Sequence, residues 1–468
     1  MKKAIYIILS ILFLVLSLPP INFSFLIFVA FVPLFLLARE CRFVATAVLG
    51  AVVGAAYFGA LFYWIGIYTP IGASAVILLA SIYFGLYLAL TGYFLKRSTD
   101  VWFDWLFPGA LWISAKWLIS FWKPGLLVLH IPDSLGLELR QSIYLVGENG
   151  LVLFIFLVNG WIYNFVRVPK PTREHMIQLL VLAILLLGMN SFARSRFTEP
   201  IPEDIPVAVI QPNLAYDVKW REEHYDEIKS VYDKLTREAA GSNPTLIIWP
   251  QYAFPEDLRK TPNPASELAR ELATPILLGT YVNAPDGSPL NEALYFNAEG
   301  KLAGEYAATF LPPFRFTGQK KGDTFGLIDT TIGKVGVLLC FEDTHPSLTR
   351  QLVKRGAEIM VLLCNDQFFG RSSEPYLHAS RLRLRAIEAD RFFIRAAPTG
   401  FSEIIDPRGR VLQSTQLFSE TVLTGKVRQR SGVSPYFFLG DLVSYAALGL
   451  LFGLLAQSRF RRGWKNPQ

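Results

Sequence analysis

Cys340 is the residue whose type and position most directly suggest chemistry. It ends the apolar run GKVGVLLC, and Glu342 and Asp343 follow one residue beyond it. A cysteine thiolate is a strong nucleophile. A thiol at the end of a buried strand is also a common packing residue. Both interpretations of Cys340 stay open at this point.

The run before Cys340 is one of several short apolar runs that end in polar, Pro or Gly residues, as buried strands do. The others are VAVIQPN, TLIIWPQ, PILLGTY and IMVLLCND. Between the first two lies HYDEIKSVYDKLTREAA, whose apolar residues have helical spacing, and HPSLTRQLVKRGA after Cys340 is a second candidate helix. Strands that alternate with helices predict an α/β fold with a largely parallel sheet covered on its faces.

The residues that end these strands share one predicted edge. Ligands of parallel sheets bind at the carboxyl ends of the strands. The residues at or just past those ends are Gln211, Gln251, Cys340, Asn365 and Asp366. We therefore expect Cys340 to lie where a site would form.

The composition indicates a membrane protein with a water-soluble part. The 468 residues are 52% hydrophobic and 18% charged, with a mean hydropathy of +0.34. The net charge of +7 does not indicate nucleic-acid binding, because much of the Lys and Arg flanks apolar spans. Three cysteines are too few for a disulfide scaffold. The absence of CxxC motifs and His-rich clusters predicts neither metal nor cofactor.

Eight apolar runs are long enough, at about 20 residues each, to cross a bilayer. They lie near residues 4–19, 21–38, 43–66, 70–95, 101–122, 150–166, 176–193 and 436–456. Short loops rich in Lys and Arg place both termini in the cytoplasm and the large polar segment outside. We expect a transmembrane helical domain of about seven spans at 1–194, an outward domain at 195–433, and a C-terminal transmembrane helix with a short tail at 434–468.

Lys116 is a charge inside the fifth apolar run. An intramembrane charge suggests a functional site. Its position near the outer end of the run also fits simple snorkelling to the interface.

The combination of spans and motifs resembles the bacterial apolipoprotein N-acyltransferase family, a membrane-embedded branch of the nitrilase or carbon–nitrogen hydrolase superfamily. The motifs are WPQ, EYAATFLPPFRF, VGVLLCFE, CNDQFFG, HASRLRLRAIE and APTGFSEIIDPRGRV, followed by a final span. The resemblance implies a nitrilase-like αββα sandwich on a multi-span helical base in the bacterial cytoplasmic (inner) membrane, with the sandwich facing the periplasm or cell exterior.

The resemblance also implies a reaction and its partners. The family moves an acyl chain from a phospholipid to the amine of a lipoprotein's diacylglyceryl-cysteine, through a thioester on its catalytic Cys. Cys340 matches that nucleophile, and Glu342 matches the acid two residues beyond it. The expected binding positions are Trp249, Phe316, Asn365, Asp366, Phe369 and His378. Neither nucleic acid nor a second copy of the chain is expected as a partner.

Two catalytic positions depart from the family. Gln251 stands at the position of the general-base Glu, and Ala308 stands at the position of the Lys. A third acid of the family aligns with Phe316. Gln cannot accept the thiol proton, and loss of a base slows a reaction by about 10²–10⁴. Loss of an oxyanion donor slows it by roughly 10²–10³.

Several alternatives follow from these departures. A substitute acid or amine is one of them, and the candidates are Glu256, Lys301, Glu305, Lys320, Lys321 and Glu342. A disulfide between Cys340 and Cys364 would silence the thiol, if the two strands end level with each other. The competing function is a catalytically silent relative that binds acyl chains or lipoproteins. A soluble-type amidase needs the same missing residues, and a transporter is disfavoured because the spans carry almost no internal charge.

Overall fold

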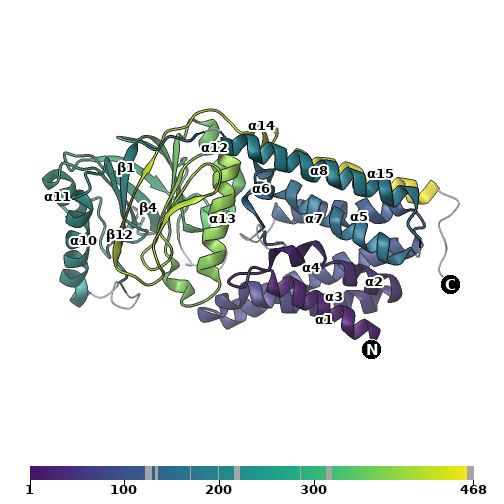
Figure 1. Ribbon diagram of the computed structural model, residues 1–468. Coiled ribbons are helices and arrows are strands. Elements are labelled where there is room, and N and C mark those ends of the chain that lie inside the picture. Colours follow the sequence, from purple (N-terminus) through teal and green to yellow (C-terminus); the bar gives the residue numbers. More distant parts are fainter. Residues whose placement is uncertain are drawn as a thin grey trace. The chain divides into compact units, whose positions relative to one another are not determined.

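The computed structural model describes residues 1–121, 129–131, 135–168, 170–198, 200–214, 222–284, 286–311 and 319–460. The chain divides into two compact units (Figure 1). One unit comprises Met1–Thr198 and Phe438–Gln468, and the other comprises Glu199–Phe437.

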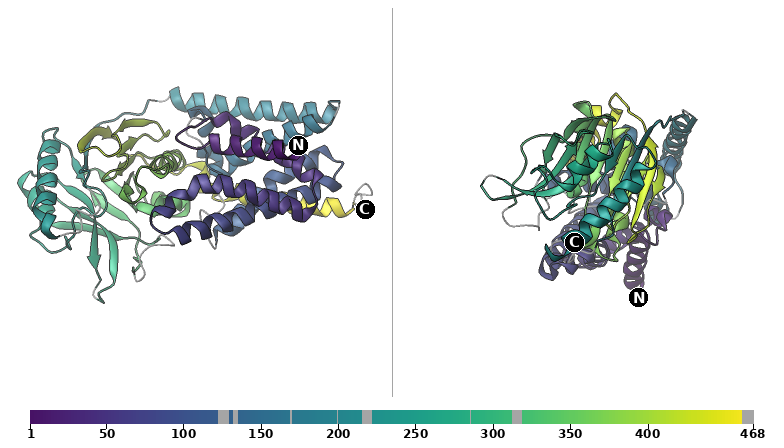
Figure 2. Two further views of the ribbon diagram at one scale, coloured as in Figure 1. Left: turned by 90° about the horizontal axis from the view of Figure 1, so that it is seen from below. Right: turned by 90° about the vertical axis from the view of Figure 1, so that its left-hand side faces the viewer.

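The described part of the first unit is helical, and its long helices run alongside one another (Figure 2). Its helices are α1 (Lys2–Leu16), α2 (Val32–Glu40), α3 (Phe43–Phe62), α4 (Pro70–Arg97), α5 (Val101–Ser120), α6 (Leu137–Arg140), α7 (Ile143–Arg167), α8 (Arg173–Thr198) and α15 (Leu442–Phe460), with 3-10 helices at Ser24–Phe28 and Tyr63–Ile67. Four segments are long and apolar enough to cross a membrane: Phe43–Ile67, Pro70–Arg97, Ile143–Arg167 and Arg173–Thr198.

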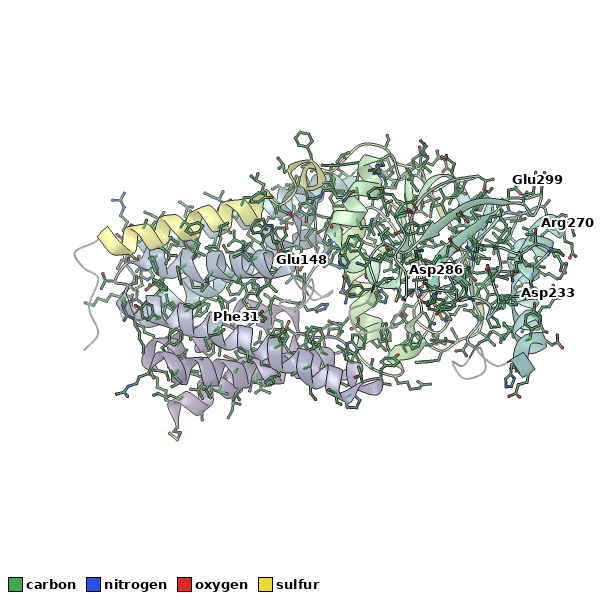
Figure 3. All side chains as sticks on the ribbon, turned by 180° about the vertical axis from the view of Figure 1, so that it is seen from behind. Phe31, Glu148, Asp233, Arg270, Asp286 and Glu299 are labelled. Carbon is green, nitrogen blue, oxygen red and sulfur yellow. The ribbon has the colours of Figure 1, made fainter. Side chains whose placement is uncertain are left out.

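The apolar run at 21–38, expected to be long enough to cross a bilayer, does not form one continuous helix. That run forms the 3-10 helix Ser24–Phe28 and the nine-residue helix α2, with a break between them. At the break, the Phe31 backbone N–H donates to Asn159 Oδ1 of α7 at 2.9 Å. Phe31 itself is buried among the helices, with its ring 4.6 Å from that of Phe156 (Figure 3). A side chain from another helix therefore satisfies the interrupted backbone, as an apolar surrounding requires.

Lys116 is not an isolated charge. Its Nζ lies 2.8 Å from Oε1 of Glu148, and each side chain is 19% exposed. Glu148, labelled in Figure 3, follows Gly147, whose φ of 67° interrupts the helical geometry of α7. An ion pair between α5 and α7 thus replaces snorkelling as the account of Lys116.

The second unit is an α/β sandwich of two six-stranded sheets. The sheet orders are β12-β1-β2-β3-β4-β5 and β11-β10-β9-β8-β7-β6. In each sheet three neighbouring strands are parallel, β1–β2–β3 in one and β7–β8–β9 in the other, and the outer pairings are antiparallel. The strands are β1 (Ile205–Gln211), β2 (Leu246–Ile248), β3 (Ile276–Asn283), β4 (Pro289–Phe296), β5 (Leu302–Ala307), β6 (Leu327–Thr330), β7 (Gly333–Leu339), β8 (Ile359–Leu363), β9 (Phe393–Ala396), β10 (Glu403–Ile405), β11 (Val411–Ser414) and β12 (Thr421–Val427).

Helices cover the outer face of each sheet. They are α10 (Tyr225–Ala240) and α11 (Pro264–Glu271) on the first sheet, and α12 (Pro346–Lys354) and α13 (Glu374–Ala389) on the second. The short helix α14 (Pro435–Leu439) spans the unit boundary. Asp233 on α10 and Arg270 on α11 lie on the solvent side of this layer (Figure 3). The predicted αββα class, and the helices predicted on either side of Cys340, are confirmed. The prediction of a largely parallel sheet is wrong: both sheets are mixed, because their outer strands are joined by antiparallel pairings.

Alternation along the strands explains the three apolar layers. Val207 and Val209 of β1 face the interior between the sheets, whereas Ala208 and Ile210 face the α10–α11 layer. In the second sheet, Leu339 faces the interior and Leu338 faces α12 and α13. Since the central strands β1, β2, β7 and β8 are largely buried on both faces, they read as continuous apolar runs.

Candidate active site

Cys340 stands in a strained backbone conformation directly after β7. It opens a 3-10 helix, Cys340–Thr344, and its φ is +47°, in the left-handed region that non-glycine residues rarely adopt. Such conformations cost about 1–3 kcal/mol and cluster at functional sites. The side chain is 9% exposed. All three cysteines are free thiols, so the disulfide weighed between Cys340 and Cys364 is absent.

Glu342 is held by five hydrogen bonds. Its Oε1 accepts from the Tyr306 hydroxyl at 2.7 Å, from the Thr309 backbone N–H at 2.8 Å and hydroxyl at 3.1 Å, and from the Phe310 N–H at 3.2 Å. Its Oε2 accepts from the Leu339 N–H at 2.9 Å. Burial raises the pKa of Glu342, and the hydrogen bonds oppose that rise. The carboxylate thus ties the end of β7 to the segment after β5, which does not suit a base for the thiol.

Gln251 follows β2 by three residues and is 1% exposed. A Cβ on Gly279 of β3 would lie 2.6 Å from the Gln251 Cα, so only glycine permits this approach. The close approach fixes the backbone of Gln251 at the carboxyl end of the parallel strands. Its amide is neutral and cannot take up a proton.

Ala308 directly follows β5 and is 2% exposed. Its N–H donates to the Asn291 carbonyl at 2.9 Å, and its carbonyl accepts from the Gly322 N–H at 2.8 Å. Its methyl group belongs to the apolar layer between the two sheets. The position expected to carry an ammonium therefore contributes packing and no charge.

The candidate substitutes away from the Cys340 turn are surface residues. Glu256, Lys301, Glu305, Lys320 and Lys321 are all exposed. The Tyr225 hydroxyl donates to Glu256 at 2.7 Å, and Lys320 pairs with Asp286 at 3.0 Å. None of the five is buried beside the Cys340 turn.

Trp249, one of the expected binding residues, packs among aromatic side chains. It is fully buried, with its ring 4.7 Å from Tyr232 of α10 and 5.8 Å from Phe254. It packs in the layer between the first sheet and α10. Phe316, another expected binding residue, lies outside the described residues.

Gln211 is at a strand end, as expected, but its amide is used for structure. Its Oε1 accepts from the hydroxyls of Ser402 at 2.8 Å and Thr415 at 2.7 Å. Its Nε2 donates to the carbonyls of Gln416 at 2.8 Å and Ser419 at 3.0 Å. Gln211 thus holds together loops from distant parts of the chain.

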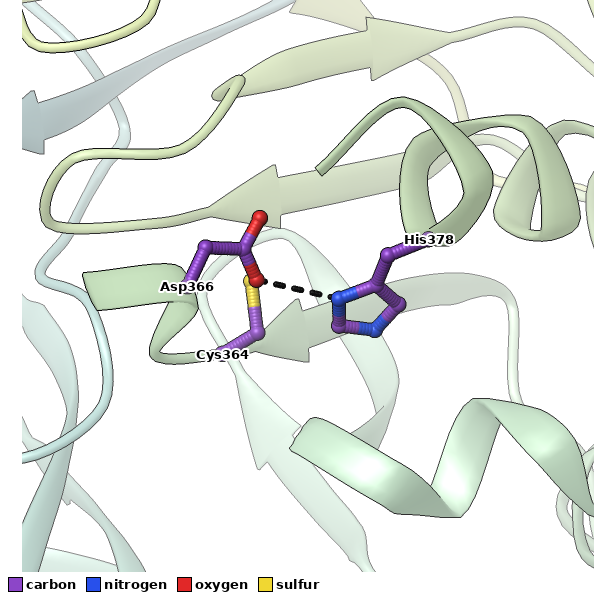
Figure 4. A group of neighbouring side chains, drawn as sticks. All are labelled: Cys364, Asp366 and His378. Atoms are coloured by element: carbon purple, nitrogen blue, oxygen red, sulfur yellow. Dashed lines mark hydrogen bonds and ion pairs between the residues drawn. The ribbon is translucent and has the colours of Figure 1, made fainter. Parts of the chain in front are cut away.

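Asn365, Asp366 and Phe369 surround a second turn, after β8. The Asn365 side chain caps the 3-10 helix Asp366–Phe369 by accepting from the Gln367 N–H at 3.1 Å. Asp366 lies 3.0 Å from Nδ1 of His378, an interaction drawn in Figure 4. The Phe369 ring lies 6.0 Å from the His378 ring, edge to face. The structure therefore brings four of the residues expected at the site together.

Opposite charges set the protonation of this cluster. Burial by itself raises the pKa of Asp366, but Arg395 and His378 bring it down to about 2. Burial lowers the pKa of His378, but Asp343 and Asp366 raise it to about 9. His378 is therefore an imidazolium at neutral pH, between ionised carboxylates.

Asp343 is a site residue that sequence reasoning singled out only by its position near Cys340. It is fully buried, with Oδ2 3.4 Å from His378 Nε2 and 3.6 Å from Arg381 Nη1. Arg381 also lies 3.4 Å from Glu374, whose pKa burial raises to about 7. The signal for this network was the density of charged residues in the α13 sequence EPYLHASRLRLRAIE. Their burial was not visible there.

Cys364, Asp366 and His378 offer ligand atoms within 4.8 Å of one another (Figure 4). Arg395 Nη2 already lies 2.5 Å from the Asp366 carboxylate, and both nitrogens of His378 face carboxylates. The Cys364 thiol donates to the Ala396 carbonyl at 3.4 Å, and burial raises its pKa. Since a guanidinium and an imidazolium already neutralise this cluster, the residues do not fit a metal ion.

Comparisons with known proteins agree with this architecture. The carbon-nitrogen hydrolase family model matches residues 207–434, and the apolipoprotein N-acyltransferase N-terminal domain model matches residues 10–161. The apolipoprotein N-acyltransferase of Geobacter metallireducens is 31% identical over 97% of this chain and 95% of its own length. That of Nitrosomonas europaea is 27% identical over 91% of this chain and 92% of its own length. Among solved structures, Nit3 of Saccharomyces cerevisiae, a nitrilase-superfamily member, is 19% identical, with a TM-score of 0.41 over 49% of this chain and 91% of its own.

Proposed function

We propose that this chain, which belongs to the apolipoprotein N-acyltransferase family, acylates the N-terminal amine of lipoproteins through a thioester on Cys340, with a smaller set of catalytic groups than the family's. The observation that carries the proposal is the Cys340 turn. A free thiol in a left-handed backbone conformation opens a turn at a strand end, and Glu342 ties that turn to the segment after β5. The apolar helices of the first unit make this a membrane protein. We further propose that it works in the bacterial inner membrane with its α/β unit outside the cytoplasm.

The proposed reaction has two transfers. The Cys340 sulphur attacks an ester carbonyl of a phospholipid, so that an S–C bond forms and the C–O bond to glycerol breaks. The lysophospholipid leaves as an alcohol and takes up a proton. The terminal amine of the diacylglyceryl-cysteine lipoprotein then attacks the thioester, an amide N–C bond forms, the C–S bond breaks, and the nitrogen's proton returns to the thiol.

The residues beside Cys340 limit this chemistry. A thiol with a pKa near 8.5 is only a few per cent thiolate at neutral pH. Gln251 cannot remove its proton, and Ala308 offers no donor to the oxyanion. If the two losses multiply, the reaction is slower by a factor on the order of 10⁴–10⁷. This is an upper figure, because the effects of groups in one catalytic unit do not combine independently.

The second candidate is a silent relative that binds lipoproteins or acyl chains. The specific observation in its favour is the packing of the Ala308 methyl group in the apolar layer between the sheets, where the family has an amine. Such a protein would bind lipid without forming a covalent bond to it.

Mass spectrometry separates the two candidates. The full chain in lipid nanodiscs is incubated with phospholipid carrying an alkyne-tagged acyl chain, and the Cys340 peptide is examined for a thioester adduct. We expect the tag on Cys340 of the wild type and no tag in the Cys340→Ala variant. The Cys364→Ser variant, the matched control at a second buried thiol, should still carry the tag on Cys340. A folded chain whose Cys340 stays unmodified after prolonged incubation would reject acyl transfer and leave the binding function. Transfer is then followed with a diacylglyceryl-cysteine peptide.

A further inference from the structure

Two buried carboxylates lie in the turns that follow neighbouring parallel strands. β7 and β8 run in register, with Leu339 opposite Leu363. Asp343 lies in the turn after β7, which Cys340 opens, and Asp366 lies in the turn after β8. Their side chains are fully buried.

His378 of α13 joins these two carboxylates. Its Nδ1 lies 3.0 Å from Asp366 Oδ1 and its Nε2 lies 3.4 Å from Asp343 Oδ2, and the side chain is 3% exposed. Arg395 of β9 holds the other oxygen of Asp366 at 2.5 Å. The chain of ionic contacts therefore runs from β9 through the turn after β8 to the turn that carries the thiol.

The backbone is shaped around this chain of contacts. A Cβ on Gly400 would lie 2.2 Å from Asp366 Oδ2, so the carboxylate occupies the space that any other residue would fill. Burying several charges costs desolvation energy, and apolar residues of the same volume stabilise a fold at least as well. Stability alone therefore gives no reason for charges at this place.

We propose that His378 is a positioning residue for Cys340: it links Asp343 to Asp366 and supplies the positive charge that neutralises the Asp343 carboxylate in the turn that Cys340 opens. The proposal rests on Cys340 being the reacting group, as proposed above. His378 contacts the turn that carries the thiol at Asp343 and acts through that residue.

The charges around His378 predict opposite effects for two substitutions. Without its imidazolium, the Asp343 carboxylate disfavours a thiolate three residues away; without Asp343, the remaining imidazolium favours one. Arg381 also faces Asp343, which limits both effects. The titratable and charged groups that surround His378 are Asp343, Cys364, Asp366, Glu374, Arg381, Arg385 and Arg395.

The test is the pH dependence of Cys340 alkylation in the full chain, which requires no acyl substrate. Iodoacetamide rates are measured between pH 6 and 10, and adducts are assigned to each cysteine by peptide mass spectrometry. His378→Asn keeps a donor for Asp366 and removes the charge and the contact to Asp343. His345→Asn is the matched control, because His345 is also buried and close to Asp343, but burial lowers its pKa, so the substitution removes no positive charge.

We expect the midpoint of the Cys340 profile to rise by about one pH unit in His378→Asn and to fall by about one unit in Asp343→Asn. The double variant should return near the wild-type midpoint, and His345→Asn should not move it.

The proposal is overturned if the His378→Asn profile coincides with that of the wild type, or if both single variants shift in one direction. It is also overturned if Cys364 and Cys41 become reactive together with Cys340, which would indicate general loosening. Should His378→Asn not fold, Asp343→Asn alone decides, because a midpoint that stays or rises contradicts the proposal. An unmodified Cys340 in the phospholipid assay would remove the proposed function and leave this result standing.

Discussion

Restoring the two missing charges tests whether they limit the reaction. Gln251→Glu alone places a carboxyl group at a position that is 1% exposed, where burial raises its pKa and leaves it largely protonated at neutral pH. Ala308→Lys alone places an ammonium in an apolar layer at a position that is 2% exposed, where burial favours the neutral amine. Each single change should therefore raise the rate of thioester formation by less than about 10-fold. In the double variant we expect each group to act as the counter-charge of the other.

The expected gain of the double variant follows from the size of the two losses. A positioned base raises the rate by about 10²–10⁴ and an oxyanion donor raises it by roughly 10²–10³. The two rate factors do not simply multiply, because the groups belong to one catalytic unit. A lysine at 308 also overpacks its surroundings, which costs about 1–3 kcal/mol. We expect an increase of about 10²–10⁴ in the double variant, equivalent to about 3–5 kcal/mol of barrier.

The assay is single-turnover acylation of Cys340 by tagged phospholipid, followed by mass spectrometry. A matched control makes the same two changes at exposed strand positions, Ala303→Lys on β5 and Gln413→Glu on β11. If the folded double variant forms the thioester no faster than the wild type and the control, then Gln251 and Ala308 are not what limits the chain. A gain equal to the product of the single gains would also contradict the reasoning, because it would show that the two groups act independently.

Three further predictions concern the support around the site. Glu342→Gln should lower the free energy of unfolding by about 1–3 kcal/mol, since an amide cannot accept from both Leu339 and the opposite segment, and this is the cost of a buried donor left unsatisfied. Chemical unfolding measures this loss, and an unchanged midpoint contradicts it. Gly400→Ala should displace Asp366, whose oxygen lies 2.2 Å from the new Cβ, and lower the thermal midpoint, whereas Gly188→Ala, where nothing lies within 4 Å of the new Cβ, should not lower it. Because the pKa of His378 is raised to about 9, its stabilising contribution is complete below about pH 6.5 and is lost as the pH rises through 9; the thermal midpoint of His378→Asn should lack that decline.

Pattern in the sequence predicted the sandwich because each buried strand ends abruptly. The runs before Gln251, Cys340 and Asn365 are apolar on both faces, so they read as strands without an alternating period. The polar residue after each run marked the carboxyl end, and the topology of parallel strands then gathered these residues along one edge. That step required only local signals.

The direction in which each side chain points could not be predicted from local sequence in the same way. Trp249 and Gln251 are two residues apart, yet one packs under α10 and the other lies against Gly279. The second apolar run was interpreted as one span because hydropathy does not reveal a break in the helix. At this break the Asn159 side chain of α7 accepts a hydrogen bond from the Phe31 backbone. Both outcomes depend on partners far away in the sequence, which no local window contains.

The contacts that hold the Cys340 turn in its strained conformation are separate from the groups that would activate the thiol. The left-handed conformation at Cys340 is maintained at a cost of about 1–3 kcal/mol, and the hydrogen bonds of Glu342 and the ionic contacts of Asp343 are what hold the turn against it. Gln251 and Ala308 are not among the partners of Glu342 or Asp343, so these supports do not depend on the residue types at positions 251 and 308. The geometry of the nucleophile therefore does not depend on the groups that would activate it. A chain can present a well-placed thiol and still react slowly, and only the rate of thioester formation, not the shape of the turn, distinguishes a slow transferase from a binding protein.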